Sequence, residues 1–453
     1  MAMQLSKSDY MDYLRHPALL WLKKHDKSKL PPIDDSTQAM FDAGHKFEAY
    51  GEALFTGGVT LGFNDFNEYK TLTARTQHAL QNGARTIFQS RFEWNEYNCL
   101  PDIIDVIEGN LIDLYEIKSS TRVKEEHIYD LAFQRAVIEA NGLKIRKIFV
   151  IYVNNEYVRQ GDIVPEELTK MEDVTLAVHN LASFTEATMP LALETIRSAV
   201  MPDPNPTLLG KFGDKKEWQA IYDSLVGTPA PDYMGVEPTF NKPEIDRFLG
   251  ELEFPLYFLD YETMSAVVPY FDDHRPYQQI PSQYSLHILD SPDAELRHKE
   301  YLHRDNSDPS LPIAQHLIED IGDHGSIITW NMSFEKSCNV TLGAINPEFA
   351  DAMMAINERI VDLMIPFKPK NGWYSDTRFE GSASIKKVLP VVVPLLSYKT
   401  LGIQNGGAAQ SLWMQAVLDG TRPDKEKILD DLLKYCGLDT LAMVEIYNVL
   451  KKI

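Results

Sequence analysis

Cysteine is scarce in this 453-residue sequence, which contains only Cys99, Cys338 and Cys436. Their wide spacing fits no metal-binding motif, and so few cysteines are typical of proteins from a reducing compartment. Long apolar runs are lacking as well. The longest, VLPVVVPLL, is too short to cross a bilayer and is interrupted by Pro390 and Pro394. The N-terminal segment MAMQLSKSDYMDYL has no apolar signal region, so we expect a cytoplasmic protein without a membrane partner.

Positive charge is also in short supply. The 44 Lys and Arg residues face 66 Asp and Glu residues, which gives a formal net charge of −22. Phosphate contacts need Lys and Arg, so this chain can bind nucleic acid only through local basic patches or bound metal ions. The candidate patches lie at residues 23–29, 144–147, 368–370 and 386–387. We expect such binding to be weak, sensitive to salt and confined to clefts.

The pattern of residues 100–120, LPDIIDVIEGNLIDLYEIKSS, predicts a β-hairpin that turns at Gly109-Asn110. Glu116 and Lys118 are two residues apart on its second strand and therefore share a face, and Asp102 can reach them from the first strand. Two carboxylates suit a hard cation such as Mg²⁺, and a neighbouring lysine can orient a water molecule. We predict a site formed by these three side chains.

A predicted helix, IYDLAFQRAVIEANG, and an apolar strand, KIFVIYVN, follow this hairpin. The spacing Asp-x13-Glu-x-Lys in this order of elements resembles the PD-(D/E)xK nucleases of the RecB/AddB type. The resemblance implies a restriction-endonuclease-like fold, with Gln134 near the active site. It also implies that His45, in the upstream helix FDAGHKFEAYGEALF, is a metal ligand. The Q-x-x-x-Y pattern of that group is broken here by Ile138.

Nucleases of this group often carry an iron–sulfur cluster, whose first cysteine stands in an Arg-Cys-Pro-like stretch. The corresponding residues here are Arg15-His16-Pro17. The region 199–220, where the other cysteines would be expected, contains none. We therefore expect no iron–sulfur cluster and predict that packing holds this part of the chain together.

The C-terminal half contains three acidic motifs. An apolar strand, EFPLYFLDYETMS, ends in Asp260-x-Glu262, and the strand SIITW leads into NMSFEK, which contains Glu335. The last motif lies on a long amphipathic helix over residues 424–453. Tyr435 and Asp439 are four residues apart on this helix and share one face.

This order of motifs resembles that of the DEDD exonucleases, in their tyrosine subclass. The resemblance implies a ribonuclease-H-like fold. It further implies that Asp260, Glu262, Glu335 and Asp439 bind a pair of divalent metal ions and that Tyr435 positions the attacking water. Glu335 departs from the family, which usually has Asp at this position.

The region 201–245 is rich in Pro, Gly, Asp and Lys and separates the two halves. We predict an α/β protein with a RecB-like nuclease domain at 1–200, a connecting helix and linker at 201–250, and a ribonuclease-H-like exonuclease domain at 251–453. Residues 162–200 are predicted to be helical. Nearly the whole sequence, and most strongly Phe254 to Leu450, resembles an uncharacterised bacterial family that joins these two nuclease types.

The predicted function is hydrolysis of phosphodiester bonds by a nuclease that requires Mg²⁺ or Mn²⁺. DNA is the favoured substrate, and repair, recombination and defence against foreign DNA are equally open. An RNA exonuclease is one alternative, because the DEDD fold also serves RNA. A nucleic-acid-binding scaffold with one or both sites decayed is another, and Glu335 and Ile138 are the residues that favour it.

Overall fold

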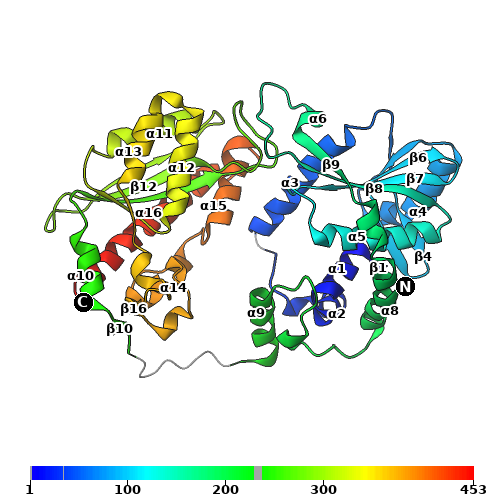
Figure 1. Cartoon of the computed structure of the whole chain (residues 1–453), viewed down its shortest axis with the longest axis horizontal. Helices are drawn as coiled ribbons and strands as arrows, with labels where there is room; N and C mark the ends of the chain where they lie inside the picture. Colours follow the sequence, from blue (N-terminus) through cyan, green and yellow to red (C-terminus); the bar gives the residue numbers. More distant parts are fainter. Residues whose placement is uncertain (1–2, 34, 229–236) are drawn as a thin grey trace. The chain divides into compact units, whose positions relative to one another are not determined.

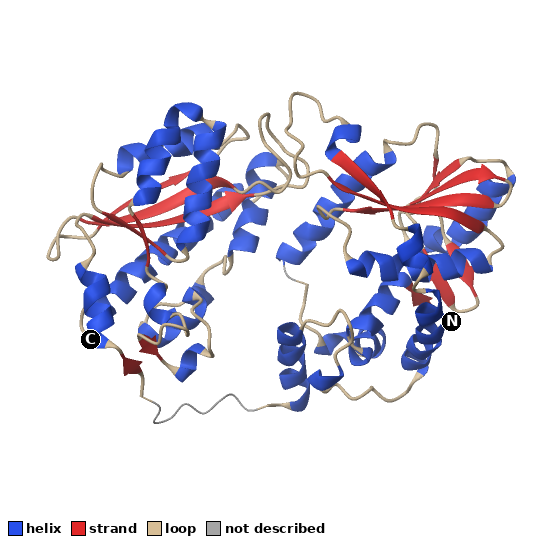
Figure 2. Cartoon of the chain, viewed as in Figure 1, coloured by secondary structure: helices blue, strands red, loops and turns tan. Residues whose placement is uncertain are grey.

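The computed structural model describes residues 3–33, 35–228 and 237–453. The chain divides into two compact units, here called the N-terminal unit (residues 1–33 and 40–230) and the C-terminal unit (34–39 and 231–453). Both combine helices with β-sheets, which confirms the predicted α/β class (Figure 1 and Figure 2). The predicted linker at 201–250 includes residues 229–236, which lie outside the described residues. Across the described ranges, no helix is both long and apolar enough to cross a bilayer.

The N-terminal unit is built on a six-stranded sheet with the order β2-β3-β6-β7-β8-β9. Its strands are β2 (Val59–Thr60), β3 (Thr86–Phe88), β6 (Ile103–Glu108), β7 (Leu111–Lys118), β8 (Lys144–Val153) and β9 (Thr169–Asp173). The predicted hairpin is confirmed: β6 and β7 are antiparallel and turn at Gly109, whose φ of 56° suits glycine. The strands β7 and β8 are parallel, so a crossover joins them.

That crossover is α5, one of the helices that cover the sheet. The helices along this part of the chain are α1 (Lys7–Arg15), α2 (Pro17–His25), α3 (Asp35–Glu52), α4 (Phe66–Gln81), α5 (Glu125–Ala140), α6 (Pro165–Leu168), α7 (Thr175–His179), α8 (Ala182–Arg197) and α9 (Lys215–Val226). A smaller sheet with the order β1-β5-β4 joins β1 (Leu5–Ser6), β5 (Tyr97–Cys99) and β4 (Phe92–Trp94).

Side chains alternate between the two faces of the sheet along β7, and their contacts show which helix covers each face. Leu114 belongs to the core that contains Phe133 of α5. Glu116 has the same parity as Leu114 and therefore projects on the face that α5 covers. On the other face, Gly51 of α3 is so close to Ile117 that a Cβ would lie 2.6 Å from the Ile117 Cδ1. Only glycine allows α3 to pack this tightly.

The prediction that residues 162–200 are helical is wrong in part, because β9 lies within this region. The sequence of β9, TKMED, is mostly exposed and polar and has no apolar alternation that would indicate a strand. It is extended because it pairs antiparallel with β8, with Val153 opposite Thr169. Tertiary pairing therefore overrides local sequence preference here.

The Arg15-His16-Pro17 stretch is held by stacking and apolar packing. The rings of His16 and Trp218 stack with centroids 4.1 Å apart. Trp218 shares a small core with Ala18, Leu22 and Ile221, and its indole N–H donates to the carbonyl oxygen of Pro204 at 2.8 Å. These contacts fasten α9 to α2.

The C-terminal unit is built on a five-stranded sheet with the order β13-β12-β11-β14-β15. Its strands are β11 (Leu256–Met264), β12 (Ile280–Leu289), β13 (Arg297–Leu302), β14 (Ser326–Thr329) and β15 (Ile360–Asp362). The pairs β13–β12 and β12–β11 are antiparallel, and the pairs β11–β14 and β14–β15 are parallel. A separate two-stranded sheet pairs β10 (Thr239–Phe240) with β16 (Tyr374–Ser375).

Helices cover both faces of this sheet (Figure 1). They are α10 (Lys242–Gly250), α11 (Ser310–Asp320), α12 (Met332–Ile345), α13 (Ala350–Glu358), α14 (Ile385–Val392), α15 (Gly406–Trp413) and α16 (Lys425–Leu450). One core joins the sheet to α11, α12 and α13, and the other joins it to α10, α14, α15 and α16. The long final helix that the sequence predicts is α16.

Candidate active sites

Side-chain parity on β11 determines where its two acidic residues point. Tyr257, Leu259 and Tyr261 belong to the core beneath α11, α12 and α13. Residues of the opposite parity, such as Phe258, belong to the core that α16 covers. The alternation therefore directs Asp260 and Glu262 toward α16. The register with β12 shifts after Glu262, so the strand is irregular next to this pair.

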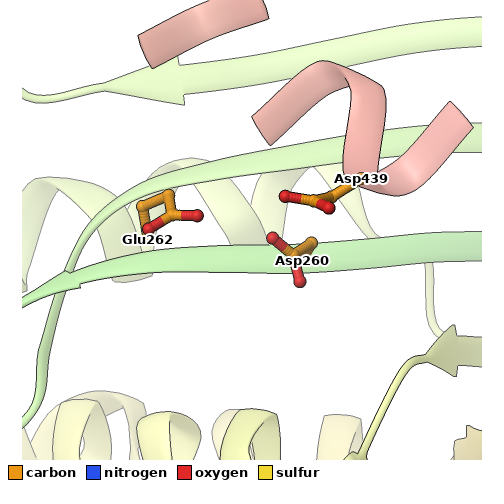
Figure 3. Close-up of side chains that lie close together, drawn as sticks. All are labelled: Asp260, Glu262 and Asp439. Carbon is orange, nitrogen blue, oxygen red and sulfur yellow. The ribbon is translucent and has the colours of Figure 1, made fainter. Parts of the chain in front are cut away.

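Asp439 of α16 meets the two β11 carboxylates (Figure 3). Each of Asp260, Glu262 and Asp439 offers a carboxylate oxygen, and these oxygens all lie within 4.8 Å of one another. Within the described part of the chain, no other group of three His, Cys, Asp or Glu residues is this close. We call these three residues the carboxylate triad.

The triad lies in a cavity of about 340 Å³. Besides the triad, it is lined by aromatic, glycine, amide and lysine residues from β11, the β14–α12 connection, α12, α14, α15 and α16. They include Trp330, Phe334, Lys386, Gly406, Gly407, Gln410 and Tyr435. A concave pocket with converging polar groups and apolar walls is the usual form of a ligand site.

Burial and mutual repulsion favour the protonated form of the triad. Burial and then the charges of Asp439, Glu262 and Glu335 raise the pKa of Asp260 well above its usual value. Burial and Asp439 do the same to the pKa of Glu262. Burial raises the pKa of Asp439 to about 6, although its hydrogen bond from Tyr398 and the charge of Lys386 act in the opposite direction. A cation in the pocket would relieve this repulsion.

Two tyrosines flank Asp439. Tyr398 donates a hydrogen bond to Oδ1 of Asp439, and its ring centroid is 6.0 Å from that of Tyr435. The ammonium of Lys386 donates to the carbonyl oxygen of Gln404 at 2.8 Å and lies 6.0 Å from the Tyr398 ring centre. Tyr398 and Lys386 belong to residues 385–410, a segment without a recognised motif. From the sequence, Lys386 is a candidate only as part of the basic pair at 386–387, and no sequence signal identifies Tyr398 as a site residue.

Glu335 lies in the first turn of α12 and is 1% exposed. Its carboxylate is not part of the triad, but its charge acts on Asp260. Burial and then the charge of Asp362 raise the pKa of Glu335 to about 8. Its Oε2 atom is buried without a hydrogen-bond partner among the described residues. A buried acceptor without a donor is costly, so a proton or a cation at Glu335 would stabilise this region.

Asp362 has a structural role beside Glu335. Its Oδ1 accepts hydrogen bonds from the backbone N–H groups of Asn331 and Met364, both at 3.0 Å. Its Oδ2 accepts from Lys368 at 2.7 Å. Asn331 has a φ of 78°, so this anchoring holds a left-handed residue at the start of α12.

The second cluster lies at the end of the β6–β7 hairpin. Ile103 pairs with Tyr115, so the antiparallel register continued by one residue sets Asp102 opposite Glu116 on the same face. Oδ2 of Asp102 accepts the backbone N–H of Ile117 at 2.7 Å. The sequence prediction that these two carboxylates face the same side of the hairpin therefore agrees with the register.

A hydrogen-bonded network surrounds Glu116, which is 1% exposed. Oε1 of Glu116 accepts from Lys118 at 2.7 Å and from Lys7 at 2.6 Å, while Oε2 accepts from Gln134 at 2.9 Å. Lys118 also donates to Asp130 at 2.9 Å, and Gln134 donates to Asp130 at 3.1 Å. The structure thus joins Lys118 and Gln134 to Glu116, and it adds Lys7 and Asp130.

The charges in this network shift several pKa values. Burial and then the charge of Glu116 raise the pKa of Asp102 to about 7. Burial opposes ionisation of Asp130, but Lys118 and Lys7 outweigh it and lower the Asp130 pKa. Burial lowers the Lys118 pKa, but Asp130, Glu116 and Asp102 more than offset this and raise it. Two ammonium groups and three carboxyl groups therefore share one buried site.

His45, the predicted metal ligand, lies on α3. Its side chain is 74% exposed, and its Nδ1 is 3.4 Å from Oε2 of Glu48 on the same helix. That helix, α3, packs against the face of β7 that carries Ile117, whereas Glu116 projects from the opposite face. The role of His45 as a metal ligand stays a prediction.

Comparison with known proteins finds a similarity to one domain family and to three curated proteins. A family model described as "Domain of unknown function (DUF2779)" matches residues 257–384. That region contains Asp260, Glu262 and Glu335 and ends before Asp439.

Three curated relatives match at low identity. The "Uncharacterized protein MG366 homolog" of Mycoplasma pneumoniae is 28% identical over 223 residues, which are 43% of this chain and 32% of that protein. The "Uncharacterized protein MG366" of Mycoplasma genitalium is 27% identical over 208 residues, or 42% of this chain and 31% of that protein. The "Uncharacterized protein UU173" of Ureaplasma parvum is 24% identical over 238 residues, or 46% and 33%. The chain covers about a third of the length of each relative.

Proposed function

We propose that this chain is a metal-dependent nuclease that hydrolyses phosphodiester bonds, with DNA as the favoured substrate. The observation that carries the proposal is the carboxylate triad of Asp260, Glu262 and Asp439, whose ligand atoms lie within 4.8 Å of one another in a pocket. The predicted ribonuclease-H-like fold is supported by the strand order β13-β12-β11-β14-β15. The predicted nuclease fold of the N-terminal unit is supported by the β6–β7 hairpin and the α5 crossover.

The donor set of the C-terminal site fits a divalent cation. Asp260, Glu262 and Asp439 supply the oxygen ligands that Mg²⁺ and Mn²⁺ prefer. Burial raises the pKa of all three, and neighbouring carboxylates raise the pKa of Asp260 and Glu262 further, so a cation would stabilise the ionised form. The unpartnered Oε2 of Glu335 is a further acceptor nearby. When bound, such an ion would acidify water and neutralise the charge that develops on a phosphate.

The protein's own residues supply the remaining functions. Tyr398 orients the Asp439 carboxylate, and Tyr435 lines the pocket where it can contact water or substrate. Lys386 brings positive charge to the pocket, which suits a phosphate. In the N-terminal site, Lys118 bridges Glu116 and Asp130 and is the residue placed to stabilise developing negative charge.

A direct test uses single-stranded DNA and RNA labelled at one end and incubated with Mg²⁺ or Mn²⁺. We expect the wild-type protein to degrade DNA, and EDTA to stop the reaction. Lys118→Ala and Asp260→Ala should each remove one component of the activity, whereas Asp323→Ala should not, because the Asp323 side chain is 99% exposed and pairs with His324. Absence of cleavage with both metals and both substrates would contradict the proposal, and cleavage of RNA alone would favour the exonuclease alternative.

A scaffold with a decayed N-terminal site is the second candidate. The observation that favours it is that one oxygen of Glu116 is already engaged by both Lys7 and Lys118. In that case Lys118→Ala would leave cleavage unchanged while the N-terminal unit still binds nucleic acid. The cleavage assay, combined with a binding titration of the same oligonucleotides, therefore separates a working N-terminal site from a binding surface.

A further inference from the structure

Two lysines from distant parts of the sequence contact the same oxygen atom of Glu116. Lys118 reaches it from the same strand at 2.7 Å, and Lys7 reaches it from the start of α1 at 2.6 Å. Lys118 belongs to the recognised motif, whereas Lys7 lies 109 residues before Glu116 and belongs to none. A carboxylate oxygen can accept two hydrogen bonds, so this oxygen accommodates both ammonium groups, and Lys7 adds a second positive charge to the site.

Lys7 is held firmly in position. The strand β1, which immediately precedes it, pairs with β5, and Leu5 within β1 is fully buried. Ser6 caps α1 by accepting the N–H of Asp9 at 3.2 Å, while the Asp9 carboxylate accepts the Ser6 N–H. One helical turn after Lys7, the ring of Tyr10 stacks on that of Phe133 in α5, with ring centroids 5.0 Å apart. The fold therefore directs the Lys7 side chain to the end of β7.

The two lysines differ in how many of their hydrogen-bond donors are used. An ammonium group carries three N–H donors. Lys118 uses two of them, on Glu116 and Asp130, whereas the recorded acceptor of Lys7 in the described chain is Glu116. Lys7 keeps 20% of its side-chain surface accessible and Lys118 keeps 24%, while Glu116 keeps 1%. An anion that approaches this site therefore meets the lysines rather than the carboxylate, and of the two lysines Lys7 has more free donors.

We propose that Lys7 is a substrate-binding residue that contacts a phosphate group of the nucleic acid at the N-terminal site. The inference rests on the proposed nuclease function and identifies which residue attracts the polyanion. The chemical basis of this proposal is charge. The carboxylates of Asp102, Glu116 and Asp130 would together repel a phosphate, and Lys118 already donates hydrogen bonds to two of them, Glu116 and Asp130. Lys7 supplies the positive charge that lets a phosphodiester approach these carboxylates.

The test measures how binding depends on salt. Full-length protein is titrated into a fluorescein-labelled single-stranded DNA oligonucleotide in buffer with Ca²⁺, at several NaCl concentrations, with a gel to verify that the DNA stays intact. For single strands the slope of log K against log [salt] changes by about 0.7 for each phosphate contact. Lys7→Gln and Lys7→Met should each lower the magnitude of this slope by about 0.7, and Lys7→Arg should restore it.

Lys170 provides a control outside the candidate basic patches. It also forms an ion pair in the N-terminal unit, with Glu156 at 2.7 Å, and its side chain is 41% exposed. Lys170→Gln should leave the slope unchanged. If Lys7→Gln and Lys7→Met lower the unfolding temperature but keep the wild-type slope, Lys7 is only structural and the inference is wrong. If the wild-type protein does not bind the oligonucleotide at all, the proposed function itself fails.

Discussion

Oδ1 of Asp439 accepts a hydrogen bond from the hydroxyl of Tyr398, which lies 41 residues earlier in the chain. Both side chains are buried, at 8% exposure each. The bond joins a segment without a recognised motif to the helix that carries the last acidic motif. The orientation of one triad carboxylate therefore depends on residues 385–410 as well as on α16, and this dependence can be tested.

Replacing Tyr398 with Phe removes the donor and leaves the ring in place. Partners that orient metal-binding carboxylates typically contribute ten- to a hundredfold to metal affinity or activity. We expect Tyr398→Phe to lower the Mn²⁺-dependent activity of the C-terminal site by about that factor, measured in a Lys118→Ala background. Tyr270→Phe is the control, because Tyr270 donates to the surface residue Asp419 at 2.7 Å. Equal activities of the two variants would count against a positioning role for Tyr398.

The sequence predicts the contacts between site residues that lie close together in the chain better than the contacts between residues that lie far apart. Asp102 and Glu116 are brought together by a local hairpin, so alternation and one Gly-Asn turn suffice. The same holds for Asp260 and Glu262, which share a strand, and helical spacing places Asp439 on the face of Tyr435. These pairings follow from the periods of strands and helices alone.

The residues that sequence analysis missed reach the sites over long distances. Lys7 and Tyr398 have no motif around them, and only tertiary packing brings them to Glu116 and Asp439. Asp130 is a partial exception, because it lies four residues before Gln134 and so shares its helix face. The strand β9 was missed because its pairing with β8 is likewise a tertiary contact.

Glu335 predicts a dependence of stability on pH. Burial raises its pKa to about 8, above the usual value for a glutamate. A carboxyl group whose pKa is higher in the folded than in the unfolded state binds its proton on folding, so this stabilisation is full at low pH and is lost as the pH rises from about 4.5 to about 8. We expect the free energy of unfolding to fall over that range.

Glu335→Gln keeps the shape of the protonated acid and cannot ionise. In urea denaturation with EDTA present, this variant should be more stable than the wild type at pH 8.5 by on the order of 2 kcal/mol and should show a weaker dependence on pH. Glu319→Gln, on the exposed side of α11, should keep the wild-type profile. An unchanged pH profile in Glu335→Gln would show that other groups cause the dependence.

The boundary between the two units can be tested by limited proteolysis. The units divide between residues 230 and 231, within the region that is rich in Pro, Gly, Asp and Lys. The interval 227–241 lies between α9 and α10 and contains Tyr233 and Phe240 but neither Lys nor Arg. Chymotrypsin should therefore produce two stable fragments by cleavage there, as judged by mass spectrometry. Rapid cleavage elsewhere with this interval intact would contradict the boundary.

The carboxylate triad predicts that Mn²⁺ stabilises the C-terminal unit. A ligand that binds only the folded state stabilises it by about 2.7 kcal/mol at a concentration 100-fold above its Kd, which corresponds to a rise of roughly 5 to 10 °C for a unit of this size. Asp260→Asn removes one triad carboxylate and its charge, so we expect it to abolish the Mn²⁺-induced rise in the unfolding temperature of this unit. Asp323→Asn, which changes an exposed aspartate of the same unit, and Asp102→Asn, which changes the other site, should both keep the rise. Calorimetric scans of the full-length variants with and without Mn²⁺ measure all four proteins under the same conditions. If Asp260→Asn keeps the full rise, the cation binds elsewhere and the triad is not its site.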